Sequence, residues 1–138
     1  MEFLRTGALG PLTFGLTPAQ VISAIGMPLK KAKLRNPAIW NYGGLDVTLL
    51  DGKLVHLSLQ FAEGLALPDG LPWEGWMPTR ATKAPELQAY AARGKLVFVA
   101  DPALTFHTQG GFTVGRTSVV FSRNVPGGEL DSITASKP

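Results

Sequence analysis

The 138-residue chain contains no cysteine, and this absence excludes several kinds of site at once. Without a thiol, the chain can form no structural disulfide, no zinc–thiolate centre and no cysteine nucleophile. Charged residues are also scarce, at 17%, and no apolar run reaches the roughly 18 residues that a membrane-spanning helix requires. The first residues lack the basic and apolar regions of a signal peptide, so we expect a cytoplasmic protein without a membrane span.

Basic residues outnumber acidic ones by 13 to 10, which gives a formal net charge of +3. Nucleic-acid-binding proteins usually carry a broad basic stripe with interleaved aromatic or amide side chains. This chain has one basic cluster, formed by Lys30, Lys31, Lys33 and Arg35, and its other cations are spread singly. Nucleic acid is therefore not the expected partner. We expect the cluster to lie in a loop that is either simply solvated or steers an acidic protein partner toward the chain.

The segment 16–26 carries the signals of a short helix. Thr17 can cap its first turn, Gln20 sits where a capping-box partner belongs, and Gly26 suits its end. Val21, Ile22 and Ile25 fall at positions i, i+1 and i+4 on one face. A helix of about two turns is not stable alone, so this face must dock on something larger.

A sheet is predicted to provide that support, with strands over 39–42, 45–50 and 53–61. Asp51-Gly52 is a strong signal for a tight hairpin between the last two strands. Side chains alternate along the third strand, so one face is expected to be buried and the other largely solvated. The set expected on the buried face is Val55, Leu57, Leu59 and Phe61, and the set expected on the other face is Leu54, His56, Ser58 and Gln60.

The second half follows the same order of elements. Residues 85–94 predict a helix that starts with proline and ends with glycine, and strands are predicted over 96–99, 105–108, 117–122 and 129–134. The predicted fold class is therefore α+β, with two diverged copies of a short helix plus an antiparallel β-meander packed into one small domain. That single domain, 1–138, would consist of a half-repeat at 12–61, a connector at 62–80 and a half-repeat at 81–135.

The first half also resembles a known family. Gly15-Leu16-Thr17, Gln20-Val21, Ile25-Gly26-Met27-Pro28 and Trp40-Asn41-Tyr42 are similar to the motif of the SmpA/OmlA outer-membrane assembly lipoproteins. The β-lactamase-inhibitor-protein family shares that helix-plus-antiparallel-sheet architecture in tandem copies. The match covers about residues 15–61 and implies a structural role for the motif, with Trp40 and Tyr42 assigned first to packing. Small bacterial immunity proteins, which neutralise a toxin, have a similar layout.

No catalytic constellation is evident in the sequence. The two histidines, His56 and His107, lie in different halves, and they would form a metal or acid–base site only if the fold brought both rings together with a carboxylate. The glycine-rich segment 110–117 has the spacing of a phosphate-binding loop, but a strand rather than a helix follows it, so we interpret it as a hairpin or bulge. We expect no cofactor, no metal and no catalytic residue.

Binding of a protein partner is the favoured function. The connector carries Trp73, Trp76 and Met77, residue types that dominate interface energetics when exposed, and the alternative is that they cover the edge of the core. With the basic cluster, they predict a non-enzymatic immunity or inhibitor protein that blocks a toxin or enzyme with an acidic surface. One alternative is an envelope-assembly scaffold, and a second is a small-ligand or metal-dependent enzyme using His56 and His107. The exposed edges of the predicted sheet also make a homodimer possible.

Overall fold

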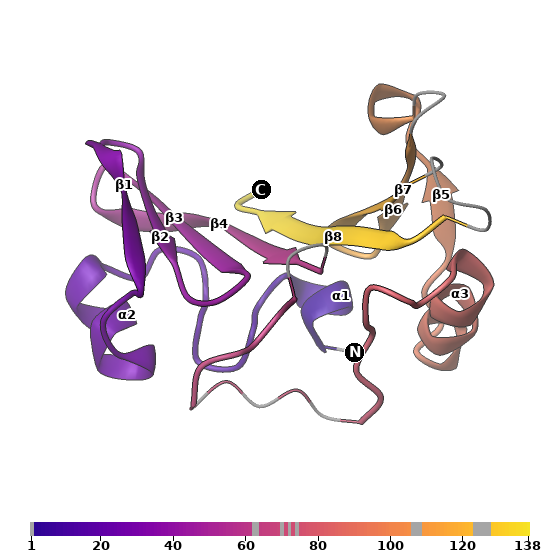
Figure 1. Cartoon of the computed structure of the whole chain (residues 1–138), viewed down its shortest axis with the longest axis horizontal. Helices are drawn as coiled ribbons and strands as arrows, with labels where there is room; N and C mark the ends of the chain where they lie inside the picture. The colour runs from indigo at the N-terminus through magenta and orange to yellow at the C-terminus, as the bar shows by residue number, and fades with distance from the viewer. Residues whose placement is uncertain are drawn as a thin grey trace.

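The computed structural model describes residues 2–61, 64–69, 71, 73, 75–105, 109–122 and 128–138. These residues form one eight-stranded antiparallel sheet with a few short helices, so the α+β class is confirmed (Figure 1). The strands are β1 (Lys30–Arg35), β2 (Ala38–Asn41), β3 (Leu45–Leu50), β4 (Lys53–Gln60), β5 (Phe98–Ala100), β6 (Gln109–Val114), β7 (Thr117–Ser122) and β8 (Leu130–Ser136). The α-helices are α1 (Glu2–Thr6), α2 (Pro18–Ile25) and α3 (Ala84–Arg93), and a 3-10 helix, η1, covers Pro102–Leu104.

The strand order is β1-β2-β3-β4-β8-β7-β6-β5, so β1 and β5 are the two edges of the sheet. Each half supplies a helix followed by four strands, and the last strands of the two halves, β4 and β8, pair at the centre. The three α-helices and the described parts of the connector lie on one side of the sheet (Figure 1). Its other side carries none of them, and we call this side the open face. One face of the sheet is therefore buried by the α-helices, and the other is largely free of them, although Leu104 of η1 lies against Gly111 on that face.

The helix α2 forms where the local signals place it. The Thr17 hydroxyl accepts a hydrogen bond from the Gln20 amide at 3.3 Å, and the Gln20 side chain accepts one from the Thr17 amide at 2.9 Å. This reciprocal pair satisfies two amides that the first turn would otherwise leave unpaired. Of the three residues predicted on one face, Val21 and Ile25 are buried in the core, and Ile22 is half-buried against it.

The β3–β4 hairpin also forms as predicted. Asp51 and Gly52 both have positive φ, at 51° and 74°, which is the conformation that a two-residue hairpin turn requires. The predicted alternation along β4 is wrong at three residues: Leu54 is fully buried, Ser58 is also buried, and Val55 is only half-buried. The register shifts between Thr48 and Leu49, so that His56 faces Thr48 but Leu54 faces Leu49. The extra residue of this bulge returns Leu54 to the buried side.

Some elements differ from the sequence prediction, and others agree with it. The basic cluster at 30–35 is the edge strand β1 and not a loop, and α1 was not predicted at all. The glycine-rich segment contains β6 and the turn into β7, which agrees with a hairpin. Of the strand predicted over 105–108, residues 106–108 lie outside the described residues, and Thr105 is not in a strand.

The core lies between the buried face of the sheet and the layer of helices beneath it. Phe3 and Leu4 bring α1 into this core, and the Leu4 carbonyl accepts a hydrogen bond from the Arg116 amide at 2.8 Å, in the turn between β6 and β7. Trp40 and Tyr42 are also buried, as expected, and the Tyr42 hydroxyl donates to the Gly26 carbonyl at 2.9 Å. Because Phe3 and Leu4 are buried and Leu4 is bonded to the turn before β7, the helix α1 closes the core under the second half of the sheet. None of the helices in the described part of the chain is long and apolar enough to cross a membrane.

Candidate binding surfaces

The basic strand β1 is the most strongly charged surface of the described chain. All six of its residues are exposed, and it has a neighbouring strand, β2, on one side only. The Lys31 ammonium lies 5.0 Å from the centroid of the Trp40 ring, a cation–π contact that holds this side chain against the sheet. Among the described residues, the ion pairs join Arg5 to Glu2 and Arg80 to Glu129, so no carboxylate neutralises β1.

Exposed apolar side chains lie within β1 and just before it in the chain. Met27, Leu29 and Leu34 are 63%, 74% and 68% exposed, although leucine and methionine are residues that usually enter a core. Leu29 directly precedes β1, and Leu34 lies within it. This edge of the molecule therefore combines positive charge, exposed apolar surface and unpaired backbone groups.

The turn that follows β1 is fixed to the neighbouring hairpin by its side chains. The Asn36 amide group donates to a carboxylate oxygen of Asp51 at 2.9 Å, and the Asp51 backbone amide donates to the Asn36 side-chain oxygen at 2.9 Å. Two reciprocal hydrogen bonds join turns that are 15 residues apart in sequence. The edge strand is thus anchored at its end and is not a free arm.

The connector residues point largely into the protein. Trp73 is half-buried, its ring meets Phe3 edge-on at 6.5 Å between centroids, and its indole N–H donates to the Trp76 carbonyl at 2.9 Å. Trp76 packs on Tyr90 of α3 at 4.9 Å between centroids and keeps 38% of its surface exposed. Met77 is half-buried against the core. Trp76 therefore retains the most surface for a partner among the three residues.

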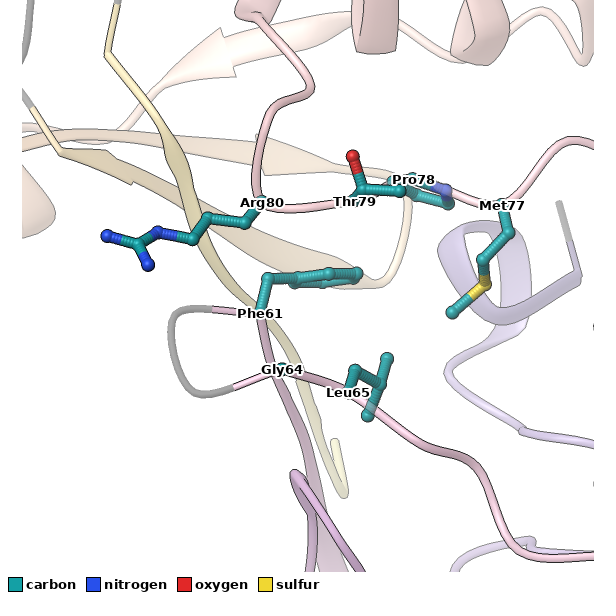
Figure 2. A pocket seen from close by; sticks show the side chains of 7 residues that line it. All are labelled: Phe61, Gly64, Leu65, Met77, Pro78, Thr79 and Arg80. Carbon is teal, nitrogen blue, oxygen red and sulfur yellow. The ribbon is translucent and has the colours of Figure 1, made fainter.

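A hollow of about 530 Å³ lies between Phe61 at the end of β4, residues 64–65 and residues 77–80 of the connector. Figure 2 shows Phe61, Leu65 and Met77 turned toward this space, whereas the side chain of Arg80 extends away from it. Arg80 instead donates from Nε to a Glu129 carboxylate oxygen at 2.7 Å. The hollow is accordingly lined by apolar groups and has no free charge from Arg80 directed into it.

The open face of the sheet is lined by short polar side chains. The registers align one residue from each strand in a single row across the sheet, and most of these residues carry a hydroxyl, amide or carboxylate group. From β1 to β5 the row is Lys30, Asn41, Asp46, Ser58, Thr134, Ser118, Thr113 and Val99. The Asn41 side chain donates to an Asp46 carboxylate oxygen at 2.8 Å, which fixes both groups.

His56 belongs to the next row of the open face. Its Nδ1 lies 2.6 Å from the Ser136 hydroxyl oxygen on β8. Burial lowers the pKa of His56 below its ordinary value, and the negative charge of Asp46 opposes this shift. His107 lies outside the described residues, and the described part of the chain holds no group of three or more potential metal ligands.

The structure does not bring the predicted contact residues into one surface. Lys30, Lys31, Lys33 and Arg35 lie on one edge of the sheet, whereas Trp76 packs on α3, beneath the opposite end (Figure 1). The open face was not predicted as a continuous polar surface, although the alternation within single strands indicated its composition. Comparisons of the chain with protein-family models, with curated proteins and with solved structures return no match.

Proposed function

We propose that this chain is a non-enzymatic binding module that blocks an acidic protein partner, as immunity and inhibitor proteins do. The observation that carries the proposal is the chemistry of β1. Its four cations, Lys30, Lys31, Lys33 and Arg35, are exposed, and no described carboxylate pairs with them. An acidic partner would supply the missing counter-charges.

An extended segment of the partner fits this edge best. A strand laid beside β1 would form main-chain hydrogen bonds, and acidic residues along it would meet the β1 cations. Leu29 and Leu34 would lose water-exposed apolar surface in the same contact. The cations would also discourage pairing of β1 with a second copy of itself, because like charges would then face each other.

The connector offers a separate and smaller contact. Trp76 packs on Tyr90 of α3 and is partly exposed, and the next residue, Met77, lines the apolar hollow. In this proposal Trp73 acts mainly by holding Trp76, because its indole N–H donates to the Trp76 carbonyl. A partner that covers β1 would need a second segment to reach these residues.

The test uses a defined acidic peptide in place of the unidentified partner. The probe is a fluorescent nine-residue peptide of alternating glutamate and valine, titrated with the full chain by fluorescence anisotropy at 50 and 300 mM salt. We expect saturable binding that weakens at least tenfold at the higher salt, since exposed charge pairs are screened. A triple variant, Lys30→Glu with Lys33→Glu and Arg35→Glu, is expected to abolish binding.

A matched control separates the edge from net charge. The triple variant Lys53→Glu, Lys83→Glu and Lys137→Glu changes the net charge equally and leaves β1 intact, so it should bind the peptide within threefold of the wild type. Amide hydrogen exchange should show protection of β1 on binding. Equal loss of binding in both triple variants, or binding that protects no β1 amide, would refute the assignment of this edge.

We also propose that the two halves are diverged copies of one unit. The support is that each half consists of a helix followed by four strands, and that the strand order of the second half mirrors the first around the β4–β8 pair. Both halves also start their main helix with proline near the first helical position. If the proposal holds, sequences related to each half will align with each other helix to helix and strand to strand.

A further inference from the structure

The open face of the sheet holds a second hollow, and this one is polar. It has a volume of about 380 Å³ and lies over β6, β7 and β8, beside the turn that joins β6 to β7. We call it the polar hollow. Its lining includes one guanidinium group and four hydroxyl groups of the open face, from Arg116, Thr113, Ser118, Thr134 and Ser136. No acidic side chain is among the described residues that line it, so the polar hollow offers hydrogen-bond donors and one positive charge.

Three of these hydroxyl groups form a row across adjacent strands. Thr113 pairs with Ser118, and Ser118 pairs with Thr134. Residues that lie opposite each other on neighbouring antiparallel strands have Cβ atoms about 4.5 to 5.5 Å apart. The hydroxyl of the neighbouring Thr117 donates to the Val114 carbonyl at 2.8 Å, but the three hydroxyls of the row form no hydrogen bond within the described part of the chain. They are therefore available to donate to a bound molecule.

The fourth hydroxyl lies between two basic groups. Ser136 pairs with His56, whose Nδ1 atom lies 2.6 Å from the Ser136 hydroxyl oxygen. Continuing the β7–β8 register by two residues places Arg116 on the other side of Ser136, and both residues line the polar hollow. When Nδ1 of His56 carries the proton, it donates to the Ser136 oxygen and leaves the hydroxyl hydrogen of Ser136 free to donate to a ligand.

The backbone at Arg116 is fixed, whereas its side chain is without a counter-charge. The Arg116 amide donates to the Leu4 carbonyl at 2.8 Å, and the adjacent Gly115 lies so close to that carbonyl that a side chain there would collide with it. Among the described residues, no carboxylate forms an ion pair with Arg116. The acidic residue of the open-face row, Asp46, lies on β3, beyond β4, and is hydrogen-bonded to Asn41. A guanidinium held in this way can donate two parallel hydrogen bonds to an oxyanion.

We propose that the polar hollow binds a phosphate group, either as the free ion or as the head of a small phosphate ester. Arg116 donates to two of its oxygens, and the hydroxyls of Ser118, Thr134 and Ser136 donate to the others. A tetrahedral oxyanion has enough acceptor oxygens for all four side chains, whereas a carboxylate has only two. The polar hollow is larger than a phosphate group, so the organic part of an ester has room beside Thr113. This site is separate from β1 and does not depend on the acidic partner proposed above.

The test is an NMR titration of the ¹⁵N-labelled full chain with inorganic phosphate at pH 7.5 and constant ionic strength. We expect saturable amide shifts at residues 116–118 and 134–136, with a dissociation constant on the order of 1 mM. Acetate, which has only two oxygens, should cause no saturable shift there. Ribose 5-phosphate distinguishes the two sources of the group: tighter binding than that of phosphate identifies an ester, and equal binding identifies the phosphate group alone.

Matched variants assign the binding to these side chains. Arg116→Gln should weaken phosphate binding at least tenfold, whereas Arg35→Gln, which removes an equal charge from β1, should leave it within twofold of the wild type. Thr134→Val keeps the shape of a half-buried side chain and removes its hydroxyl, so it should weaken binding at least threefold. Thr48→Val makes the same change at a half-buried position of the open face outside the polar hollow and should have no effect. The dispersion of the same spectra shows that each variant is folded.

A wild-type chain without saturable shifts at residues 116–118 and 134–136 would overturn the proposal. Equal weakening by Arg116→Gln and Arg35→Gln would also overturn it, because anions would then be attracted by net charge and not by a site. Arg116→Gln should still bind the acidic peptide as the wild type does, since β1 is intact in this variant. Failure of the phosphate site is therefore distinguishable from failure of the proposed β1 contact.

Discussion

Replacement of Trp73 by alanine is expected to destabilise the fold strongly, although the sequence alone also allows an exposed contact with a partner for a tryptophan in this proline-rich connector. A fully buried tryptophan removes about 150 to 250 Å² from water. Since Trp73 is half-buried, roughly 100 Å² of its apolar surface is at stake, which corresponds to about 2.5 kcal/mol. The hydrogen bond from its indole N–H to the Trp76 carbonyl adds about 1 kcal/mol.

The free energy of unfolding should therefore fall by about 3 to 4 kcal/mol, a large fraction of the 5 to 15 kcal/mol typical of a domain. For a chain of this size, that loss corresponds to a decrease in Tm of roughly 10 to 15 °C. Urea unfolding followed by circular dichroism measures it directly, provided that the slope of the transition is the same in both proteins. Trp73→Phe, which keeps an aromatic ring but loses the N–H donor, should cost about 1 to 2 kcal/mol.

The control for this measurement is Val97→Ala, which shortens a side chain that is 73% exposed and should change stability by less than about 0.5 kcal/mol. A Trp73→Ala protein that melts within 2 °C of the wild type would refute the packing described for this residue. Such a result would indicate that Trp73 contacts a protein partner directly. The measurement thus decides between the two roles that the sequence leaves open.

Two further predictions concern the turns and the open face. Gly115→Ala should cost about 2 to 4 kcal/mol in urea unfolding, because Gly115 has a φ of +59° and a Cβ there would lie 2.3 Å from the Leu4 carbonyl oxygen. Gly52→Ala, where φ is +74° but nothing lies within 4 Å, should cost only the strain of about 1 kcal/mol, and equal losses would contradict the close approach of α1. Burial lowers the pKa of His56 below its unfolded value, so the unfolded chain binds the extra proton first and stability should fall as the pH decreases through and below 6.5. Thermal unfolding between pH 7.5 and 5 should show a smaller decrease in Tm for His56→Gln than for the wild type, and identical slopes would show that His56 does not contribute.

The local elements of this fold could be predicted because their causes lie within a few residues of sequence. Thr17 and Gln20 satisfy each other's backbone amides three positions apart, so the start of α2 needs no tertiary information. Asp51 and Gly52 supply the two positive φ angles of a tight hairpin, which fixes the turn between β3 and β4. The strand predicted over 117–122 coincides with β7, in which Val119 and Phe121 are buried.

Other features depended on contacts between distant parts of the chain. The basic strand β1 has no alternation of burial, because all of its residues are exposed, and only its pairing with β2 makes it a strand. The bulge beside Thr48 places Leu54 on the buried face and not on the expected solvated face, because one additional residue in a strand reverses the faces beyond it. Neither feature leaves a periodic signal in the sequence.

The amino-acid sequence by itself determined which segments become α2, α3 and most of the strands, and it determined the charge that β1 presents. Tertiary structure alone decided that β4 pairs with β8, that Trp73 turns toward Phe3, and that β1 and β5 become the two edges. The physical reason is range. Caps, turns and alternation act between near neighbours, whereas strand order and burial depend on which surfaces far apart in the chain meet when the core excludes water.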